Sequence, residues 1–247
     1  MHHKILNFRN IGGIKTEQGT IIDDYFYRGG PLHQLSLETI ETLQKELHIK
    51  TVIDFRDYHE IERQANHENG FEIHHLNIIG DQQIGRANPS QLMEKQKEAD
   101  PKEMMIELYR QIINSPHSKA EYTKFFEILL ETDTPVYFHC SAGKDRTGLA
   151  AAFLLKALGA SDEEIYEDYL LTNELSRPNI ERRLEQLENP TPQQQAFVYA
   201  FFGVHQEYLD AAYEEILKQS DTVEHYLEEA FGLTDNKRQQ LIKKFVR

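Results

Sequence analysis

The chain has 247 residues, of which 39% are hydrophobic and 28% are charged, so it can build one sizeable domain around a real apolar core. Its 27 basic and 41 acidic side chains give a formal net charge of −14, which argues against a nucleic-acid groove and against stable association with an anionic membrane. Any phosphate that this chain binds must therefore be held by local positive charge.

The start of the chain, its longest apolar run and its single cysteine suggest a cellular compartment. The start of the chain, 1–9, has no sustained apolar region of the kind found in a secretion signal. The longest apolar run, 149–155, is far shorter than the about 20 residues that span a bilayer. A single cysteine cannot form an internal disulfide, so the fold must rest on its core. We expect a cytoplasmic protein, unless a secretion signal has been removed.

The first half of the chain is typical of alternating strands and helices. A helix should begin after Ser36, whose side chain suits the N-cap position. The apolar face of that helix would consist of Leu37, Ile40, Leu43 and Leu47. Short strands are predicted at 11–14, 19–22, 25–30, 51–55, 71–78 and 135–139. This rhythm favours an α/β sheet with parallel pairing, in a single domain that covers 1–247.

A long segment, 82–132, separates the last two of these strands. It begins with polar residues, and helices are predicted at 90–98, 102–113 and 119–131. A connection of this length is either a lid or a fixed helical layer. Gly80 and Gly85 would be the hinges of a lid. The apolar side chains that would dock it are Met93, Met104, Met105, Leu108 and Ile112.

Almost everything after the last strand is predicted to be helical. No repeat or flexible linker divides this part, and its Pro and Gly residues fall mainly between helical stretches. The expected helices are 147–158, 161–171, 179–187, 192–218, 222–230 and 235–245.

The chemistry is expected in the stretch 135–148, where a buried strand leads through a short loop into an apolar helix. In such a loop successive backbone N–H groups point inward, and the helix start adds the positive end of its dipole. The result is a cradle that fits a phosphate. Cys140 would lie at its base, where the same field stabilises the nucleophilic thiolate.

Arg146 follows Cys140 with five residues between them, so its guanidinium can return over the cradle. Its planar fork can hold two phosphate oxygens and stabilise charge during phosphoryl transfer. The hydroxyl of Thr147 would donate to the sulfur when a cysteinyl-phosphate breaks, and His139 would brace the cysteine. The residues expected to bind the substrate in this loop are Ser141, Ala142, Gly143, Lys144, Asp145, Arg146 and Thr147.

Three other interpretations of this loop are less consistent with its residues. A lone cysteine is often only a small buried apolar residue. A Walker A nucleotide loop would have a further glycine and a Ser or Thr after the lysine, where Asp145 stands. A rhodanese-like sulfur carrier does not require the pair Arg146 and Thr147 at this spacing. The residues thus favour a cysteine-dependent phosphatase.

The loop 139–148 resembles the signature of protein-tyrosine phosphatases, in the Ala-Gly-Lys-Asp-Arg-Thr-Gly form of a bacterial tyrosine/dual-specificity family. Asn10 departs from that family, which often has Asp there. Other segments similar to the family are 7–13, 27–32, 54–56, 169–173 and 206–212. The resemblance implies a central sheet flanked by helices and hydrolysis of phosphotyrosine. Some members also accept phosphoserine, phosphothreonine or phosphoinositides.

A general acid must protonate the leaving oxygen, and three aspartates are candidates. Asp54 ends a predicted strand at the edge where catalytic residues of open sheets gather. Asp81 opens the long insertion, and Asp145 lies inside the loop itself, as in the resembling family. The alternative roles for these residues are a cap for Asp54, a solvated loop for Asp81 and the positioning of Arg146 for Asp145.

Two basic residues have open roles. Arg56 would either reach the substrate or pair with an acidic residue near the site. Lys144 would face solvent or outer phosphates of the substrate, and the resemblance connects a lysine there with phosphoinositides. We expect no metal or organic cofactor, because the cradle and Arg146 supply the charge, and His74 and His75 point to opposite faces of a strand.

A phosphate-binding module without turnover is the rival from another class. Such a pseudophosphatase would be expected to lack Cys140 or Arg146, and both are present. The expected partners are therefore phosphorylated proteins or phosphoinositides that act as substrates, with no nucleic acid.

Overall fold

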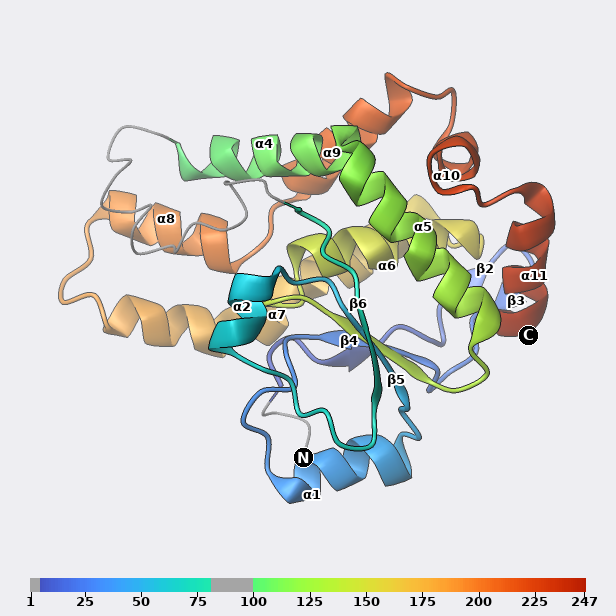
Figure 1. Ribbon diagram of the computed structural model, residues 1–247. Coiled ribbons are helices and arrows are strands. Elements are labelled where there is room, and N and C mark those ends of the chain that lie inside the picture. Colours follow the sequence, from blue (N-terminus) through green and yellow to red (C-terminus); the bar gives the residue numbers. More distant parts are fainter. Residues whose placement is uncertain (1–4, 81–99) are drawn as a thin grey trace.

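The structure is a computed structural model, and it describes residues 5–80 and 100–247 (Figure 1). A five-stranded sheet has the order β1-β4-β7-β5-β6. Its strands are β1 (Arg9–Asn10), β4 (Phe26–Gly29), β5 (Thr51–Asp54), β6 (Glu72–His75) and β7 (Val136–His139). All pair in parallel except β1, which runs antiparallel to β4. The predicted parallel α/β sheet is confirmed. β2 (Lys15–Thr16) and β3 (Gly19–Thr20) form a separate hairpin.

Successive side chains of a strand point to opposite faces of the sheet, and both faces of this sheet carry apolar side chains. In β7, Tyr137 belongs to a small core on one face, together with Leu43 of the π-helical turn η2 (Thr42–Glu46). Phe138 points to the opposite face and into the main core. Because successive strand residues face opposite ways, a strand buried on both sides must be apolar throughout. β7 lies at the centre of the sheet, and its Val136, Tyr137 and Phe138 fulfil this, while the polar His139 ends the strand.

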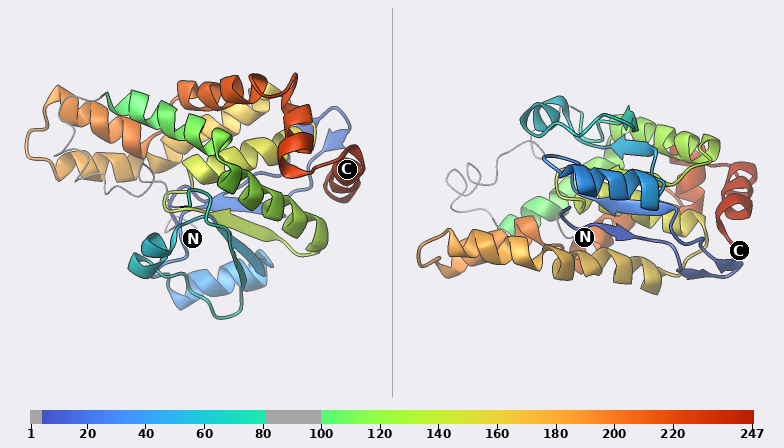
Figure 2. Two further views of the ribbon diagram at one scale, coloured as in Figure 1. Left: turned by 45° about the horizontal axis from the view of Figure 1, so that its top comes forward. Right: turned by 90° about the horizontal axis from the view of Figure 1, so that it is seen from below.

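Helices cover both faces (Figures 1 and 2). α1 and η2 lie on one face, and the longer helices gather on the other. The α-helices are α1 (Leu37–Glu41), α2 (Tyr58–Arg63), α4 (Pro101–Asn114), α5 (Pro116–Glu131), α6 (Asp145–Ala157), α7 (Asp162–Glu185), α8 (Pro192–Phe202), α9 (Gln206–Leu217), α10 (Val223–Phe231) and α11 (Asp235–Phe245). No helix in the described part of the chain is long and apolar enough to cross a membrane.

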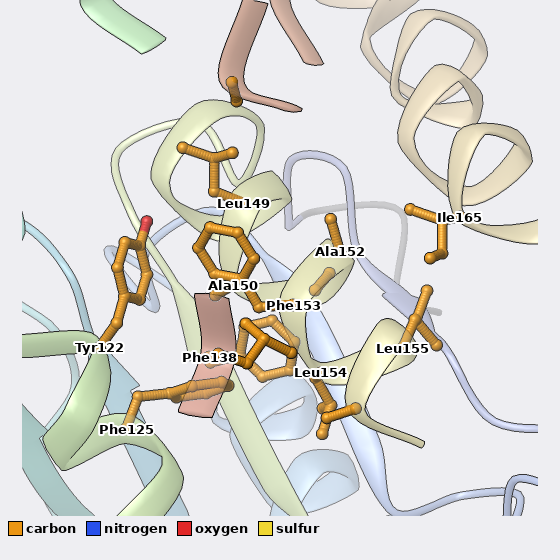
Figure 3. Close-up of a cluster of buried hydrophobic side chains, with 14 of the residues drawn as sticks. Tyr122, Phe125, Phe138, Leu149, Ala150, Ala152, Phe153, Leu154, Leu155 and Ile165 are labelled. Atoms are coloured by element: carbon orange, nitrogen blue, oxygen red, sulfur yellow. The ribbon is translucent and has the colours of Figure 1, made fainter. Parts of the chain in front are cut away.

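α6 is surrounded by the main core (Figure 3). Its side chains Leu149, Phe153 and Leu154 are completely buried. They lie among aromatic and aliphatic side chains from neighbouring elements, including Tyr122 and Phe138. A helix that is apolar on every side is a buried helix. The start of α6, which follows the predicted phosphate loop, is therefore fixed by packing.

Two of the predicted helix boundaries are wrong. α7 is continuous through Pro178, where two helices were expected, and its buried residues lie on both sides of the proline, at Thr172 and Ile180. α8 and α9 are separate, where one helix was expected. The Asn173 side chain bonds both the N–H and the carbonyl of Val204, at 2.8 and 2.9 Å, and so satisfies backbone groups that the break leaves open.

The described part of the long insertion is a helical layer. α4 packs against α8 and α9, and α5 packs against α10 and α11. Met105, Leu108 and Ile112 are buried in this contact. The helix expected at 90–98 and the hinge at Gly85 lie outside the described residues. The layer alternative therefore holds for the second half of the insertion.

α2 was not predicted, although its start has a recognisable signal. Asp57 accepts the Glu60 N–H at 2.9 Å, and the Glu60 side chain accepts the Asp57 N–H at 2.9 Å. This reciprocal capping box satisfies backbone donors that would otherwise have no partner. The helix has only six residues and no long apolar stripe, which is why hydrophobic periodicity does not reveal it.

Candidate active site

Three parallel strands end together beneath the candidate site. Gly29 and Asp54, the last residues of β4 and β5, are the partners of His139 at the end of β7. Cys140 follows immediately, and α6 begins at Asp145. The carboxyl edge of a parallel sheet is where ligands of open α/β folds bind. The loop that was predicted from its residues therefore lies where the topology favours a site.

Cys140 is buried at the base of this loop, with 2% of its surface exposed. Burial favours the neutral thiol, but the Arg146 charge, the Thr147 hydroxyl and the Ala142 backbone favour the thiolate. The pKa of Cys140 is therefore lower than its usual value. A lowered pKa places more of the nucleophilic thiolate at neutral pH. The field expected from the sequence is present around the sulfur.

Gly143 allows the loop to curl against the end of β4. Its φ is +66°, in the left-handed region, and a Cβ there would lie 2.3 Å from the backbone of Gly29. Only a glycine meets both demands without displacing the neighbouring strand. The glycine of the motif therefore has a steric role as well as a conformational one.

Arg146 is held in place by a carboxylate. Its Nη1 and Nη2 donate to Glu60 at 2.6 and 2.7 Å, and Nη1 also reaches the carbonyl of Phe55 at 3.4 Å. A guanidinium has five N–H donors. The remaining two, Nε–H and one Nη2–H, lie on one edge of the group and have no hydrogen bond to the described residues. That edge is the fork that can grip two oxygens of a phosphate.

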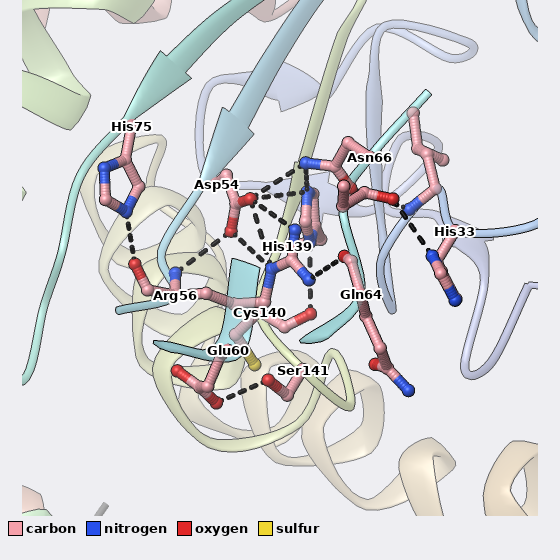
Figure 4. Close-up of polar contacts among 12 residues, drawn as sticks. His33, Asp54, Arg56, Glu60, Gln64, Asn66, His75, His139, Cys140 and Ser141 are labelled. Carbon is pink, nitrogen blue, oxygen red and sulfur yellow. Dashed lines mark hydrogen bonds and ion pairs between the residues drawn. The ribbon is translucent and has the colours of Figure 1, made fainter. Parts of the chain in front are cut away.

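Glu60 is a site residue that the sequence interpretation missed. Its carboxylate also accepts the hydroxyl of Ser141, so it joins α2 to the loop (Figure 4). Burial raises the pKa of Glu60, but Arg146 and Ser141 outweigh this and lower it to about 2. The carboxylate is therefore ionised at neutral pH and orients both neighbours. The spacing Asp57-x-x-Glu60 was the available signal, because it indicates a capping box.

Asp54 and Arg56 form a buried pair beside the loop (Figure 4). The guanidinium of Arg56 donates to Asp54 through Nε at 2.9 Å and Nη2 at 2.7 Å, and through Nη1 to the carbonyl of Gln64 at 2.6 Å. Both side chains are almost completely buried. This geometry favours the alternative in which Arg56 pairs with an acidic residue. By binding the end of α2, Arg56 also supports the position of Glu60.

The pKa of Asp54 differs from what a general acid needs. Burial raises it, but the charge and the hydrogen bonds of Arg56 outweigh this and lower it to about 2. A carboxyl with this pKa holds almost no proton near neutral pH. Asp54 is therefore placed to balance the charge of Arg56, and its geometry does not support the acid role.

Breaking this buried pair will destabilise the fold. Asp54→Asn leaves the Arg56 charge buried without its counter-ion, which costs about 3–5 kcal/mol of unfolding free energy at pH 7. The matched control is Asp133→Asn, because Asp133 pairs with Lys244 but is 89% exposed, and its loss will be far smaller. Urea unfolding measures both variants. Equal losses would contradict the structural role.

The pH dependence of this loss has a definite sign. The pKa of Asp54 falls from an ordinary 3.8 to about 2 on folding, so its ionisation stabilises the fold fully above 3.8. That contribution is lost as the pH falls through about 2. The difference between the wild type and Asp54→Asn will therefore shrink between pH 4 and pH 2. A constant difference over that range would contradict the assignment.

His139 contacts the backbone of Cys140 from the strand end. The amide of Asn66 accepts the Leu32 N–H through Oδ1 at 3.0 Å, so its Nδ2 is the donor to His139 Nε2 at 3.1 Å. The other ring nitrogen, Nδ1, then donates to the carbonyl of Cys140 at 3.1 Å. Burial lowers the pKa of His139, which agrees with a neutral ring. This bond fixes the peptide group that follows Cys140.

Asp145 lies on the loop, with its side chain 17% exposed. Its Oδ1 accepts from Lys144 Nζ at 2.8 Å and from the Tyr109 hydroxyl at 3.0 Å, and Tyr109 bonds Tyr169 at 2.7 Å. The second oxygen, Oδ2, has no hydrogen bond to the described residues. Lys144 is buried against Asp145 and does not extend into solvent. The third acid candidate, Asp81, lies outside the described residues.

A sequence model of the tyrosine phosphatase family matches residues 2–247. One relative is a protein of Cupriavidus necator that is provisionally named a tyrosine-protein phosphatase. It is 28% identical over 232 residues, which are 92% of this chain and 81% of the relative. The triple specificity protein phosphatase PtpB of Mycobacterium tuberculosis is 34% identical over 113 residues, 41% of each chain.

Two solved structures show low similarity to this chain. The catalytic core of the PP-IP phosphatase SIW14 from S. cerevisiae has a TM-score of 0.37 at 16% identity, covering 78% of this chain and 83% of the other. TpbA of P. aeruginosa has a TM-score of 0.34 at 15% identity, covering 90% and 88%. The family match itself spans nearly the entire sequence. This chain therefore belongs to the tyrosine phosphatase family and is a phosphatase.

Proposed function

We propose that this phosphatase hydrolyses phosphotyrosine through a cysteinyl-phosphate intermediate on Cys140. The observation that carries the proposal is the juxtaposition of a buried cysteine of lowered pKa with Arg146, whose free edge remains after Glu60 has fixed the rest of the guanidinium. A nucleophile and a bidentate clamp at one loop are the two groups that phosphoryl transfer from an ester requires.

In the first step the Cys140 thiolate attacks phosphorus, and the bond from phosphorus to the leaving oxygen breaks. The electron pair goes to that oxygen, which takes a proton from an acid. The loop N–H groups and the free edge of Arg146 stabilise the charge that spreads over the three equatorial oxygens. In the second step water attacks phosphorus, the phosphorus–sulfur bond breaks, and the electron pair returns to sulfur. The Thr147 hydroxyl supports the departing thiolate.

Asp145 is the acid that the geometry supports best. Its Oδ1 is engaged by Lys144 and Tyr109, while Oδ2 remains open to carry the proton. It is more exposed than Asp54, whose carboxylate is committed to Arg56. After giving its proton to the leaving group, Asp145 can take one from the attacking water.

Removing this acid will affect poor leaving groups most. Asp145→Asn should lower kcat/KM about 100-fold or more for phenyl phosphate, because kcat/KM reports the first step, in which the phenolate needs a proton as it departs. For dinitrophenyl phosphate, whose leaving group is stable as an anion, the loss will be much smaller. Steady-state rates with both esters give the ratio of the two kcat/KM values, in the variant and in the wild type. An unchanged ratio would show that the acid lies elsewhere.

The substrate range is the finer part of the proposal. Phosphoserine and phosphothreonine are further candidates. So are phosphoinositides, whose outer phosphate Lys144 beside the loop can meet once it leaves Asp145. The named relative PtpB, a triple specificity phosphatase, matches this chain over 113 residues. A panel of a phosphotyrosine peptide, a phosphoserine peptide and a phosphoinositide, with released phosphate as the readout, ranks these classes.

The same panel separates the enzyme from the rival binding module. We expect release of phosphate from the phosphotyrosine peptide, unchanged by EDTA because the chain supplies its own positive charge. Binding of the peptide without any release would favour a pseudophosphatase. Activity that EDTA removes and a divalent cation restores would point to a different phosphatase chemistry.

A further inference from the structure

Two side chains from the N-terminal part of the chain donate hydrogen bonds to a carbonyl of the phosphate loop. The oxygen of Gly143 accepts Asn7 Nδ2 at 2.7 Å and Arg28 Nη2 at 3.0 Å. Both donors are buried, with exposures of 2% and 0%. A peptide group is planar and trans, so its N–H points opposite to its C=O. Two donors on the Gly143 carbonyl therefore also fix the direction of the Lys144 N–H.

A second layer fixes these donors. Asp168 on α7 accepts from Arg28 Nη1 at 2.5 Å and from Arg9 Nε at 2.7 Å. Arg9 Nη1 also donates to Asn7 Oδ1 at 2.5 Å. The amide of Asn7 thus has one possible orientation, because its oxygen faces a guanidinium and leaves the NH2 group for the loop.

The charge of this cluster also favours an anion in the loop. Two guanidinium groups, Arg9 and Arg28, share the single carboxylate Asp168, so one positive charge remains beneath the cradle. Buried charges are little screened by solvent, which makes this excess effective over the short distance to the loop. It is a local source of positive charge in a chain whose formal net charge is −14.

We propose that Asn7 and Arg28 are positioning residues for oxyanion binding. By holding the Gly143 carbonyl inside the protein they keep the Lys144 N–H turned into the cradle, where it donates to a phosphate oxygen. They act through the loop and do not touch the substrate. This inference rests on the proposed function of the loop, and it adds residues far from the motif in sequence to the phosphate site.

Asn7→Asp tests the orientation with almost no change of shape. One carboxylate oxygen keeps the bond to Arg9, while the other replaces the donor and faces the Gly143 carbonyl, so the peptide is repelled. Competitive inhibition by inorganic phosphate and by vanadate measures the affinity of the cradle. We expect binding of both to weaken about tenfold or more, with KM rising, because a buried hydrogen bond becomes a repulsion.

Two further variants complete the experiment. Asn7→Ala removes the donor without adding charge, and binding should weaken by about two- to fivefold because Arg28 still holds the carbonyl. Thr172→Val is the matched control. Its hydroxyl contacts Arg9 at 3.2 Å and Asn7 at 3.4 Å but does not contact Gly143. Its phosphate affinity should equal that of the wild type.

The outcomes are distinguishable. Wild-type affinity in both Asn7 variants would overturn the inference. Weakening in Asn7→Asp alone would assign the effect to charge and would also overturn it, and Asn7→Ala decides if the aspartate variant does not fold. Equal weakening in Thr172→Val would show a general loosening of the cluster, against the proposal. If the wild type itself binds neither phosphate nor vanadate, the proposed function of the loop fails first.

Discussion

Replacing Cys140 by serine will abolish turnover and leave binding of phosphate esters intact. A serine hydroxyl stays protonated where this thiol ionises, so the attacking group is lost, while the loop N–H groups and Arg146 remain. Activity should fall about 10⁴-fold or more, as when other enzymes lose their nucleophile. Steady-state phosphate release and titration with a phosphotyrosine peptide measure the two properties separately.

The control for this experiment is the wild type titrated with the same peptide after vanadate has filled the loop. Vanadate should displace the peptide from the serine variant as well, because both ligands use the same donors. Appreciable turnover by Cys140→Ser would mean that another residue attacks phosphorus. If the variant loses both peptide binding and turnover, the cysteine acts in binding and not in chemistry.

Arg146→Lys will lose most activity although the charge is kept. Lysine is a point charge and cannot hold both oxygens of Glu60 while also presenting two parallel donors to a phosphate. The carboxylate of Glu60 is then poorly compensated at the edge of the site. We expect kcat/KM for a phosphotyrosine peptide to fall about 100-fold or more.

An exposed arginine provides the matched control for this substitution. Arg182 lies on the exposed side of α7, so Arg182→Lys makes the same chemical change away from the loop and should retain full activity. A near-wild-type kcat/KM in Arg146→Lys would show that the guanidinium has a structural role only. The unfolding midpoints of both variants show whether any loss comes from the fold.

The strand–loop–helix segment that contains Cys140 was predictable because its signals are local. Cys140, Arg146 and the glycine between them follow one another in a strand–loop–helix segment, so spacing alone placed them together. The parallel sheet was predictable for a similar reason, since alternating apolar strands and helices favour it. The general position of the site at the carboxyl edge then follows from topology.

The residues that hold the loop in place were not predictable in this way. Glu60 meets Arg146 across 86 positions of sequence, and Asn7 meets Gly143 across 136. Their partners are defined by tertiary packing, which leaves no spacing pattern in one sequence. Asp54 shows the same limit of sequence interpretation. Its place at a strand end suggested a general acid, whereas its burial beside Arg56 makes it a counter-ion.

The predicted helix boundaries are wrong where tertiary contacts override local sequence signals. Pro178 lies within α7, and the helix has buried residues on both sides of it, at Ser176 and Ile180. The break between α8 and α9 depends on the side chain of Asn173, which lies on α7 and replaces backbone hydrogen bonds at Val204. Neither contact is visible from propensity or periodicity.

Trapping the covalent intermediate tests the central claim most directly. The enzyme is mixed with a phosphotyrosine peptide, quenched in acid within milliseconds, digested and analysed by mass spectrometry, with Cys140→Ser as the control. We predict a phosphoryl group on Cys140 of the wild type and none on the variant. A phosphoryl group on another residue, or multiple turnovers with no covalent intermediate at the earliest quench times, would contradict the cysteinyl-phosphate mechanism.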